Sequence, residues 1–221
     1  MDVTRGKVTD PTDPRVLDSR RRIARSALRL FERDGYVGTT VADIADDAGV
    51  ALQTVYNAVG SKAAVLNMVL DTAAAGDRAP TPVLTFMQQQ TSATTTAGEL
   101  VDLLADWFAE VHPRTANVFW IIREAAAVDP EIAQLQAKRD QARLDNYQRA
   151  ANALLRRGAA GGASPTEIAA SIWSLGHPAT YAMLVGQCGW TISDYRDWVA
   201  HTLHGCLATS PAVGGTGPSE N

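Results

Sequence analysis

The chain has few cysteines, no long apolar run and no segment that resembles an export signal. Its 221 residues contain two cysteines, Cys188 and Cys206, which are too few for a disulfide framework. No cationic, apolar, small-residue signal segment opens the sequence, and the longest apolar runs fall far short of a membrane span. The composition, with 46% hydrophobic and 20% charged residues, is that of a globular protein. We therefore expect a cytoplasmic location and no membrane partner.

The sequence also lacks the short motifs of common enzyme classes. It has no G-x-S-x-G, H-E-x-x-H, G-x-G-x-x-G or Walker motif, and no lysine–serine pair follows the glycine-rich residues 158–163. His201 and His204 share a predicted helix face near Cys206, but this spacing is weak evidence for a metal site. We predict no enzyme activity, no metal and no cofactor.

Positive charge is scarce overall but locally concentrated. The formal net charge is −4. Residues 1–75 hold ten Lys+Arg and ten Asp+Glu, so their net charge is zero and the whole deficit lies in residues 76–221. Five arginines cluster at the predicted start of a helix: Arg20, Arg21, Arg22, Arg25 and Arg29. Because a phosphate-binding surface needs local positive potential rather than a basic protein, the charge does not exclude nucleic acid as a partner.

Residues 39–62 have the pattern of two short helices joined by a tight turn. Thr40 and Asp43 are spaced as a capping box, and Gly49 suits the left-handed conformation that ends a helix. Apolar residues at helical spacing continue on both sides of this turn: Val41, Ile44, Ala45 and Ala48, then Leu52, Val55, Tyr56 and Val59. Two short helices with a glycine turn make a helix-turn-helix, whose second helix can lie in a DNA major groove.

The wider segment of residues 21–70 resembles the N-terminal domain of the tetracycline-repressor (TetR) family of bacterial regulators. The matching residues are Ile23, Ala27, Leu30, Phe31, Gly35, Tyr36, Thr39, Thr40, Ile44, Ala45, Ala48, Gly49, Val50, Thr54, Tyr56, Lys62 and Leu66. Three positions depart from the family pattern, because Ala51 replaces a capping Ser or Thr, Gln53 a frequent glycine and Val59 an aromatic residue. Loss of the cap typically costs about 0.5–2 kcal/mol.

The resemblance implies an all-α fold with two functional parts. A three-helix DNA-binding domain with the helix-turn-helix is expected over residues 18–64, and a larger helical domain for effector binding and dimerisation over residues 65–208. We expect residues 1–17 to be a disordered arm and residues 209–221 a disordered tail. The last two long helices are expected to pair with those of a second copy in a homodimer.

The predicted recognition helix spans residues 52–58. The amides of Gln53 and Asn57 both donate and accept, as reading an adenine edge requires, and Leu52 and Ala58 suit a thymine methyl. Solvated amides are the alternative for the first pair. The resemblance assigns the hydroxyls of Thr54 and Tyr56 to phosphates.

Helix N-termini and arginines supply further candidate contacts to the DNA backbone. Lys62 lies next to Ser61 at the start of a helix, where we expect an outward-pointing ammonium beside free amides, and Thr40 begins another helix. Arg20, Arg21 and Arg22 either follow the DNA backbone and minor groove or form an ordinary solvated helix start.

The rest of the chain is predicted to be helical. We expect helices over 100–111, ending before Pro113, over 117–128, 130–157 and 192–207, and over 165–187 with a kink at His177-Pro178, and we expect a loop over 91–98. A ligand pocket is predicted from aromatic and polar residues in these helices: Trp107, Phe119, Trp120, Arg123, Trp173, His177 and Tyr181. Each of these residues also fits plain core or a dimer interface.

These observations predict a ligand-responsive, DNA-binding transcriptional regulator. It would be a repressor that a small, mostly hydrophobic effector releases from a near-palindromic operator, with two recognition helices about 34–36 Å apart. Two alternatives remain: a ligand-independent dimeric DNA-binding protein, or an enzyme that uses the helical body.

Overall fold

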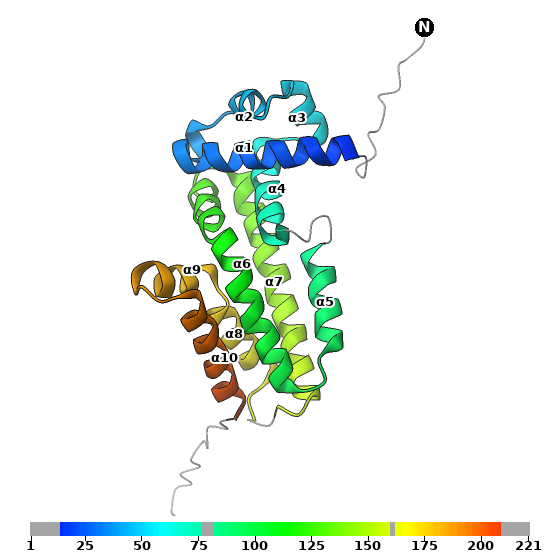
Figure 1. Ribbon diagram of the computed structural model, residues 1–221, viewed down its shortest axis with the longest axis vertical. Helices are drawn as coiled ribbons and strands as arrows, with labels where there is room; N and C mark the ends of the chain where they lie inside the picture. The colour runs from blue at the N-terminus through cyan, green and yellow to red at the C-terminus, as the bar shows by residue number, and fades with distance from the viewer. Residues whose placement is uncertain (1–13, 77–81, 160–161, 209–221) are drawn as a thin grey trace, which may run out of the picture. The chain divides into compact units, whose positions relative to one another are not determined.

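The computed structural model describes residues 14–76, 82–159 and 162–208, and every regular element in these ranges is a helix (Figure 1). The helices are α1 (Pro14–Gly38), α2 (Val41–Ala48), α3 (Leu52–Ala58), α4 (Lys62–Ala75), α5 (Val83–Ala93), α6 (Ala97–Ala126), α7 (Pro130–Arg156), α8 (Pro165–Leu175), α9 (Pro178–Tyr181), a π-helix (Ala182–Gln187) and α10 (Ile192–Ala208). The predicted all-α class is confirmed. None of the helices in these ranges combines the length and the apolar character that a membrane crossing needs.

The chain forms two compact units, and each unit is built from two stretches of sequence. The first unit comprises Met1–Val83 with Pro113–Arg139, and the second comprises Leu84–His112 with Asp140–Asn221. Both α6 and α7 therefore contribute one part to each unit. Residues 1–13 of the expected arm and the tail 209–221 lie outside the described residues, while residues 14–17 form the first turn of α1.

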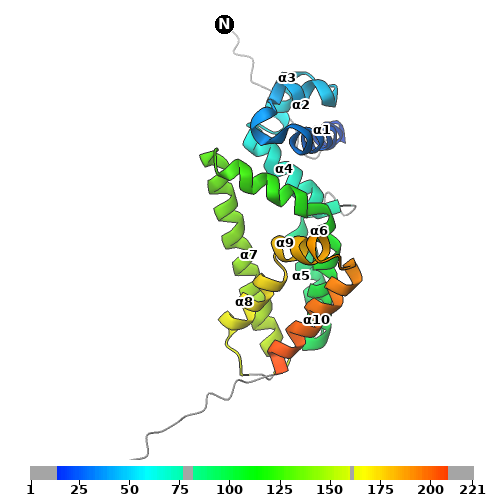
Figure 2. The same cartoon turned by 90° about the vertical axis from the view of Figure 1, so that its left-hand side faces the viewer.

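The first unit is organised around the apolar face of α1. Ile23, Ala27 and Phe31 are at most 1% exposed and pack with residues from α2, α3 and α4. Figure 2 shows these four helices together in the first unit. The core also includes residues from the later part of α6 and the start of α7, namely Val118, Ile121, Ile122, Ala125 and Ile132. Two short helices cannot bury enough surface alone, so α1 provides most of the buried surface on which α2 and α3 rest.

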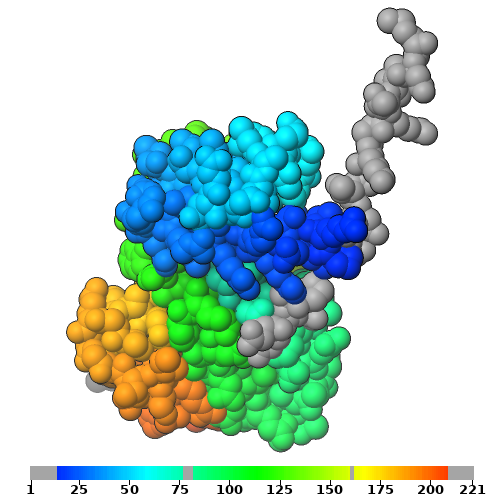
Figure 3. Space-filling model, turned by 45° about the horizontal axis from the view of Figure 1, so that its top comes forward, coloured from blue at the N-terminus to red at the C-terminus, as the bar shows by residue number. Residues whose placement is uncertain are grey.

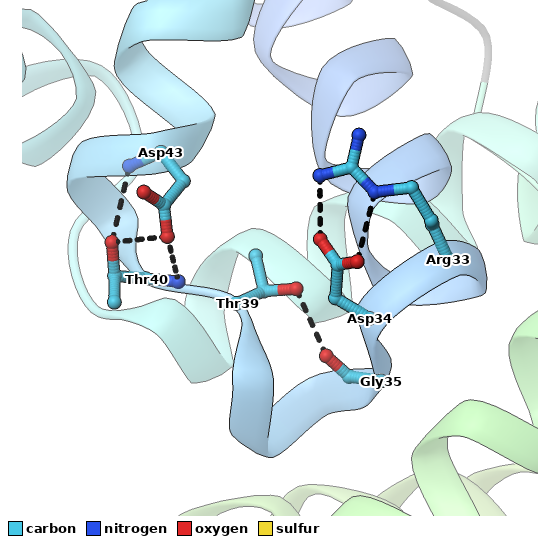
Figure 4. Close-up of polar contacts among 6 residues, drawn as sticks. All are labelled: Arg33, Asp34, Gly35, Thr39, Thr40 and Asp43. Carbon is cyan, nitrogen blue, oxygen red and sulfur yellow. Dashed lines mark hydrogen bonds and ion pairs between the residues drawn. The ribbon is translucent and has the colours of Figure 1, made fainter.

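Local capping fixes the ends of the helices in this unit as the sequence predicts. The Thr40 hydroxyl accepts from the Asp43 amide, and the Asp43 carboxylate accepts from the Thr40 amide, which is a capping box (Figure 4). Gly49 ends α2 with φ 62°, and Gly35 interrupts α1 with φ 72°. The Thr39 hydroxyl donates to the Gly35 carbonyl at 2.9 Å and holds the loop before α2.

Hydrogen bonds join the corner between α6 and α7 to the helix-turn-helix within the first unit. The Tyr36 hydroxyl donates to Asp129 Oδ2 at 2.6 Å, and the Ser61 hydroxyl donates to Glu131 Oε1 at 2.9 Å. Arg139 donates to Asp71 at 2.6 Å further along α4 and α7. The pKa of Asp129 is lowered, chiefly by the Tyr36 hydrogen bond. These contacts make residues near 129–139 part of the same compact unit as the DNA-binding helices.

The second unit packs the first part of α6 and the later part of α7 against α8 and α10. Its largest fully buried side chains include Leu100, Phe108, Leu154, Ile172, Tyr195 and Leu203. Arg196 of α10 donates to Asp106 at 2.7 Å and to Asp102 at 3.0 Å, both on α6. Gly176, at the end of α8, allows the Phe108 ring to approach the backbone closely.

Three expected features of the body differ from the structure. α6 continues through Pro113 instead of ending there, because one lost amide hydrogen bond is outweighed where buried residues lie on both sides of it. Residues 91–93, expected to be loop, end α5. At His177-Pro178 the expected kink is a full break between α8 and α9, where the Thr180 hydroxyl donates to the freed Ser174 carbonyl at 2.6 Å.

We predict that Gly176→Ala destabilises the protein by about 1–3 kcal/mol, the usual cost of overpacking a close-packed core. A Cβ at this position would lie 2.2 Å from Phe108 Cζ, so the ring or the backbone must move. Thermal unfolding measures the effect. Gly186→Ala is the matched control, because its Cβ would have no atom within 4 Å. Equal melting temperatures for Gly176→Ala and the wild type would contradict the packing described here.

We also predict acid-sensitive folding through His112. Burial, with the charges of Arg143 and His177, lowers the pKa of His112 to about 3. The unfolded histidine has a pKa of about 6.5, so the unfolded chain binds more protons between these values. The free energy of unfolding therefore falls as the pH is lowered through this window. Denaturant unfolding at a series of pH values should show a flatter dependence for His112→Gln than for the wild type or for His201→Gln.

Candidate nucleic-acid interface

The recognition helix α3 exposes the side chains that the sequence assigned to base contacts. Val55 is fully buried and anchors the helix, whereas Gln53 and Asn57 are exposed, and Leu52 and Tyr56 are 42% and 49% exposed. Thr54 and Ala58 are half-buried at the edges of this face. In Figure 3 the surface of α2 and α3, in light blue and cyan, faces the viewer and is not covered by other helices. The position of these residues suits contact with a duplex.

The two amides of the predicted reading pair are already joined. Gln53 Nε2 donates to Asn57 Oδ1 at 2.9 Å, across one turn of the helix. This bond leaves the Gln53 carbonyl oxygen as an acceptor and the Asn57 amino group as a donor. An adenine edge in the major groove offers one donor and one acceptor. The free groups of the pair therefore complement an adenine without breaking the bond between them.

Two of the three adjacent arginines make intramolecular contacts. Arg22 donates to the Ala48 and Gly49 carbonyls at the end of α2, and Arg20 donates to the Ala58 carbonyl at the end of α3. Arg21 and Arg25 are exposed and have no hydrogen-bond or ion-pair partner within the described residues. These two are the cations on α1 that are best placed to meet phosphates.

Lys62 points inward, in contrast to the outward direction expected from the sequence. Its ammonium donates to the carbonyls of Tyr36 and Thr39 at 2.6 and 2.7 Å and lies 4.2 Å from the centre of the Tyr36 ring. Burial lowers the pKa of Lys62, and the charge of Asp129 opposes this shift. The Lys62 side chain points inward because the carbonyls of Tyr36 and Thr39 accept hydrogen bonds from its ammonium. One of its three N–H groups remains for a phosphate.

Thr40 is also engaged within the protein. Both its amide and its hydroxyl donate to Asp43 Oδ2, and these hydrogen bonds lower the pKa of Asp43 (Figure 4). The carboxylate thus takes the position at the N-terminus of α2 that an anion would occupy. On the other side of Figure 4, Arg33 pairs with Asp34 at 2.6 Å, so that cation is also partly neutralised.

The residues predicted to line a ligand pocket fall into both units. Trp173, His177 and Tyr181 gather in the second unit, with the Trp173 and His177 rings 5.8 Å apart. Trp107 contacts Phe86 elsewhere in that unit. The first unit contains Phe119, Trp120 and Arg123, whose guanidinium lies 5.1 Å from the Trp120 ring. The structure therefore divides the seven residues into two groups of three, one in each unit, and Trp107 belongs to neither group.

Sequence reasoning missed the centre of the aromatic cluster in the second unit. His112 is buried, stacks with Phe108 at 5.6 Å and lies 5.6 Å from the Tyr181 ring. Its Nδ1 is 3.1 Å from the Tyr195 hydroxyl, which donates to the Leu175 carbonyl. The spacing of Phe108 and His112, four residues apart on one helix face, is the signal that marks them. No group of metal-binding side chains occurs among the described residues.

Comparison with known proteins supports the DNA-binding assignment of the N-terminal helices. Residues 23–69 match the family model described as bacterial regulatory proteins, tetR family. This segment contains most of α1, all of α2 and α3, and much of α4. A search of the curated proteins finds no match to the chain.

Solved structures share the fold over most of the chain. A Mesorhizobium loti protein described as a TetR-family transcriptional regulator has a TM-score of 0.66 and 20% identity, covering 89% of this chain and 98% of its own. NalD of Pseudomonas aeruginosa, the secondary repressor of the MexAB-OprM multidrug efflux pump, gives 0.65 and 18%, covering 86% and 97%. Bacillus subtilis FadR in complex with stearoyl-CoA gives 0.63 and 15%, covering 84% and 98%. The family match confirms the predicted resemblance for α1–α4 and shows a TetR-type DNA-binding segment there, and the likeness to these structures shows that the chain shares their fold.

Proposed function

We propose that this protein is a homodimeric repressor that a small effector releases from a near-palindromic operator. The observation that carries the proposal is the exposed face of α3, where Gln53 and Asn57 lie on a helix that Val55 anchors in a helix-turn-helix. Two such helices in a dimer enter successive major grooves about 34–36 Å apart. We propose repression of transcription, rather than activation, from the resemblance to the tetracycline-repressor family and the likeness to NalD.

Base reading is assigned to the joined amide pair and its neighbours. The Gln53 oxygen accepts from, and the Asn57 amino group donates to, an adenine edge, while Leu52 supplies apolar contact to a thymine methyl. The Tyr56 and Thr54 hydroxyls meet phosphates beside the groove. Lys62 holds the loop before α2 by its bonds to two protein carbonyls, and its remaining N–H donates to a phosphate of the DNA.

The aromatic cluster in the second unit is the proposed effector site. The His112 ring lies 5.6 Å from the Tyr181 ring, the Trp173 and His177 rings lie 5.8 Å apart, and the low pKa of His112 keeps its ring uncharged at neutral pH. These aromatic rings favour a mostly hydrophobic ligand, and FadR, which shares this fold, is in complex with stearoyl-CoA. The effector acts by binding one conformation of the dimer more tightly than the other.

The function is tested by selection of duplexes from a random-sequence DNA library, with sedimentation to measure the oligomeric state. We expect a dimer that selects one near-palindromic sequence. A monomer with no preference among duplexes would contradict the proposal.

We predict that stearoyl-CoA, or another long-chain acyl compound in a thermal-shift series, raises the melting temperature and weakens binding to the selected duplex. A ligand that binds only the folded state stabilises it by mass action. Trp173→Leu should reduce the shift, whereas Trp120→Leu, in the other unit, should leave it unchanged. An equal reduction in the two variants would contradict the assigned site.

We predict that Gln53→Ala and Asn57→Ala each relax base preference at one operator position. Loss of a bidentate amide contact costs about 1–3 kcal/mol of discrimination against the wrong base. Affinity for the selected duplex and for its single-base variants measures the effect. Gln141→Ala is the control, because it removes a glutamine that donates across one helical turn of α7, to the Asp145 carboxylate. If Gln53→Ala leaves discrimination unchanged, the assignment of Gln53 is wrong.

A further inference from the structure

Two arginines of α1 bond backbone carbonyls on the two sides of the short recognition helix, one in the turn after α2 and one at the last residue of α3. Arg22 makes three hydrogen bonds to backbone carbonyls just before α3: Nε to Ala48 O at 3.1 Å, and Nη2 to Ala48 O and Gly49 O at 2.7 and 2.6 Å. Arg20 Nη1 donates to Ala58 O, the carbonyl of the last residue of α3, at 2.6 Å. The turn before α3 and the last residue of α3 are therefore both held from α1.

These carbonyls need donors from outside their own helices. The last carbonyls of a helix have no intrahelical partner and carry the negative end of the helix dipole, so a cation there is favourable. Gly49 has φ 62°, and a Cβ on it would lie 3.6 Å from Arg22 Nη2. That distance is an ordinary van der Waals contact, so the glycine is required by the left-handed backbone conformation that ends α2.

α3 has few contacts of its own that would fix its direction. It is seven residues long, Ala51 gives it no side-chain cap, and Val55 is its one buried residue. A helix of this length is marginal in water without tertiary support. The contacts from Arg20 and Arg22 supply part of that support, at the last residue of α3 and at the turn before it.

We propose that Arg20 and Arg22 are positioning residues that set base discrimination by fixing the direction of α3, and that they do not act as phosphate contacts. The inference rests on the proposed DNA-binding function. Phosphate contact from the start of α1 is assigned instead to Arg21 and Arg25, which are exposed and unpaired within the described residues. A guanidinium suits the positioning role, because its planar fork bonds two carbonyls at once, whereas an ammonium acts as a point charge.

The test compares Arg22→Gln with Arg21→Gln, which removes the same charge from the adjacent residue. Affinities are measured for the duplex that the wild type selects from a random library and for a scrambled duplex, at several salt concentrations. Arg22→Lys keeps the charge but loses the fork. Hydrogen exchange of the amides in residues 50–58 reports on the order of α3 in each free variant.

We expect Arg22→Gln to lower the ratio of selected to scrambled affinity about tenfold, the discrimination that one base pair typically supplies. Its salt slope should match that of the wild type, and exchange in residues 50–58 should be faster. Arg22→Lys should not restore the ratio. Arg21→Gln should keep the ratio but weaken both duplexes, with the salt slope reduced by about one. Arg20→Gln should behave as Arg22→Gln does.

Two results would overturn the inference while the proposed function stands. One is an Arg22→Gln variant that weakens both duplexes equally with a smaller salt slope, and the other is full rescue by Arg22→Lys. Circular dichroism checks that each variant folds. If Arg22→Gln does not fold, the ratio of selected to scrambled affinity for Arg22→Lys decides: a reduced ratio supports the inference, and a wild-type ratio overturns it. A wild type that selects no duplex contradicts the proposed function itself, and the inference with it.

Discussion

Burial of one face of α1 is the interaction on which the DNA-binding helices depend. Ile23, Ala27 and Phe31 are almost inaccessible to solvent, and the short helices α2 and α3 pack on them together with α4. A buried phenylalanine is typically worth about 3–5 kcal/mol relative to alanine, which is a large part of the stability of a small domain. Because the same helix also carries Arg20 and Arg22, it both holds the helix-turn-helix together and fixes the direction of α3.

What the sequence predicted well was local. The capping box at Thr40 and the glycine at position 49 depend on residues within four positions of each other, so their spacing reveals them. The roles of the cations depend on contacts distant in sequence, since Arg22 meets a carbonyl 26 residues away and Arg20 one 38 residues away. The sequence around an arginine at a helix start is the same whether its partner is a DNA phosphate or a distant carbonyl. Only the folded structure shows which partner it has.

The same limit explains the errors in the body. Pro113 looks like a helix end because a proline removes one hydrogen bond, yet Val111 and Thr115 beside it are buried, and that burial decides the outcome. His177-Pro178 breaks its helix more completely than predicted, because Gly176 lies against the Phe108 ring and His177 then caps α9. His112 escaped notice for a related reason: its spacing from Phe108 places both on one helix face, but the sequence does not reveal its burial or its contacts with Tyr181 and Tyr195.

The inward use of cations has a consequence for how the protein finds its DNA. Non-specific affinity grows with the number of phosphates that Lys and Arg neutralise, and here Arg20, Arg22 and Lys62 bond backbone carbonyls while Arg29 pairs with Asp47 at 2.5 Å. Few cations are left for the DNA backbone, so a larger share of the binding free energy must come from base contacts. Specificity depends on the ratio of specific to non-specific affinity. A DNA-binding domain with a net charge near zero has a low non-specific affinity. Its ratio of specific to non-specific affinity is therefore higher, provided that the direction of α3 is well fixed.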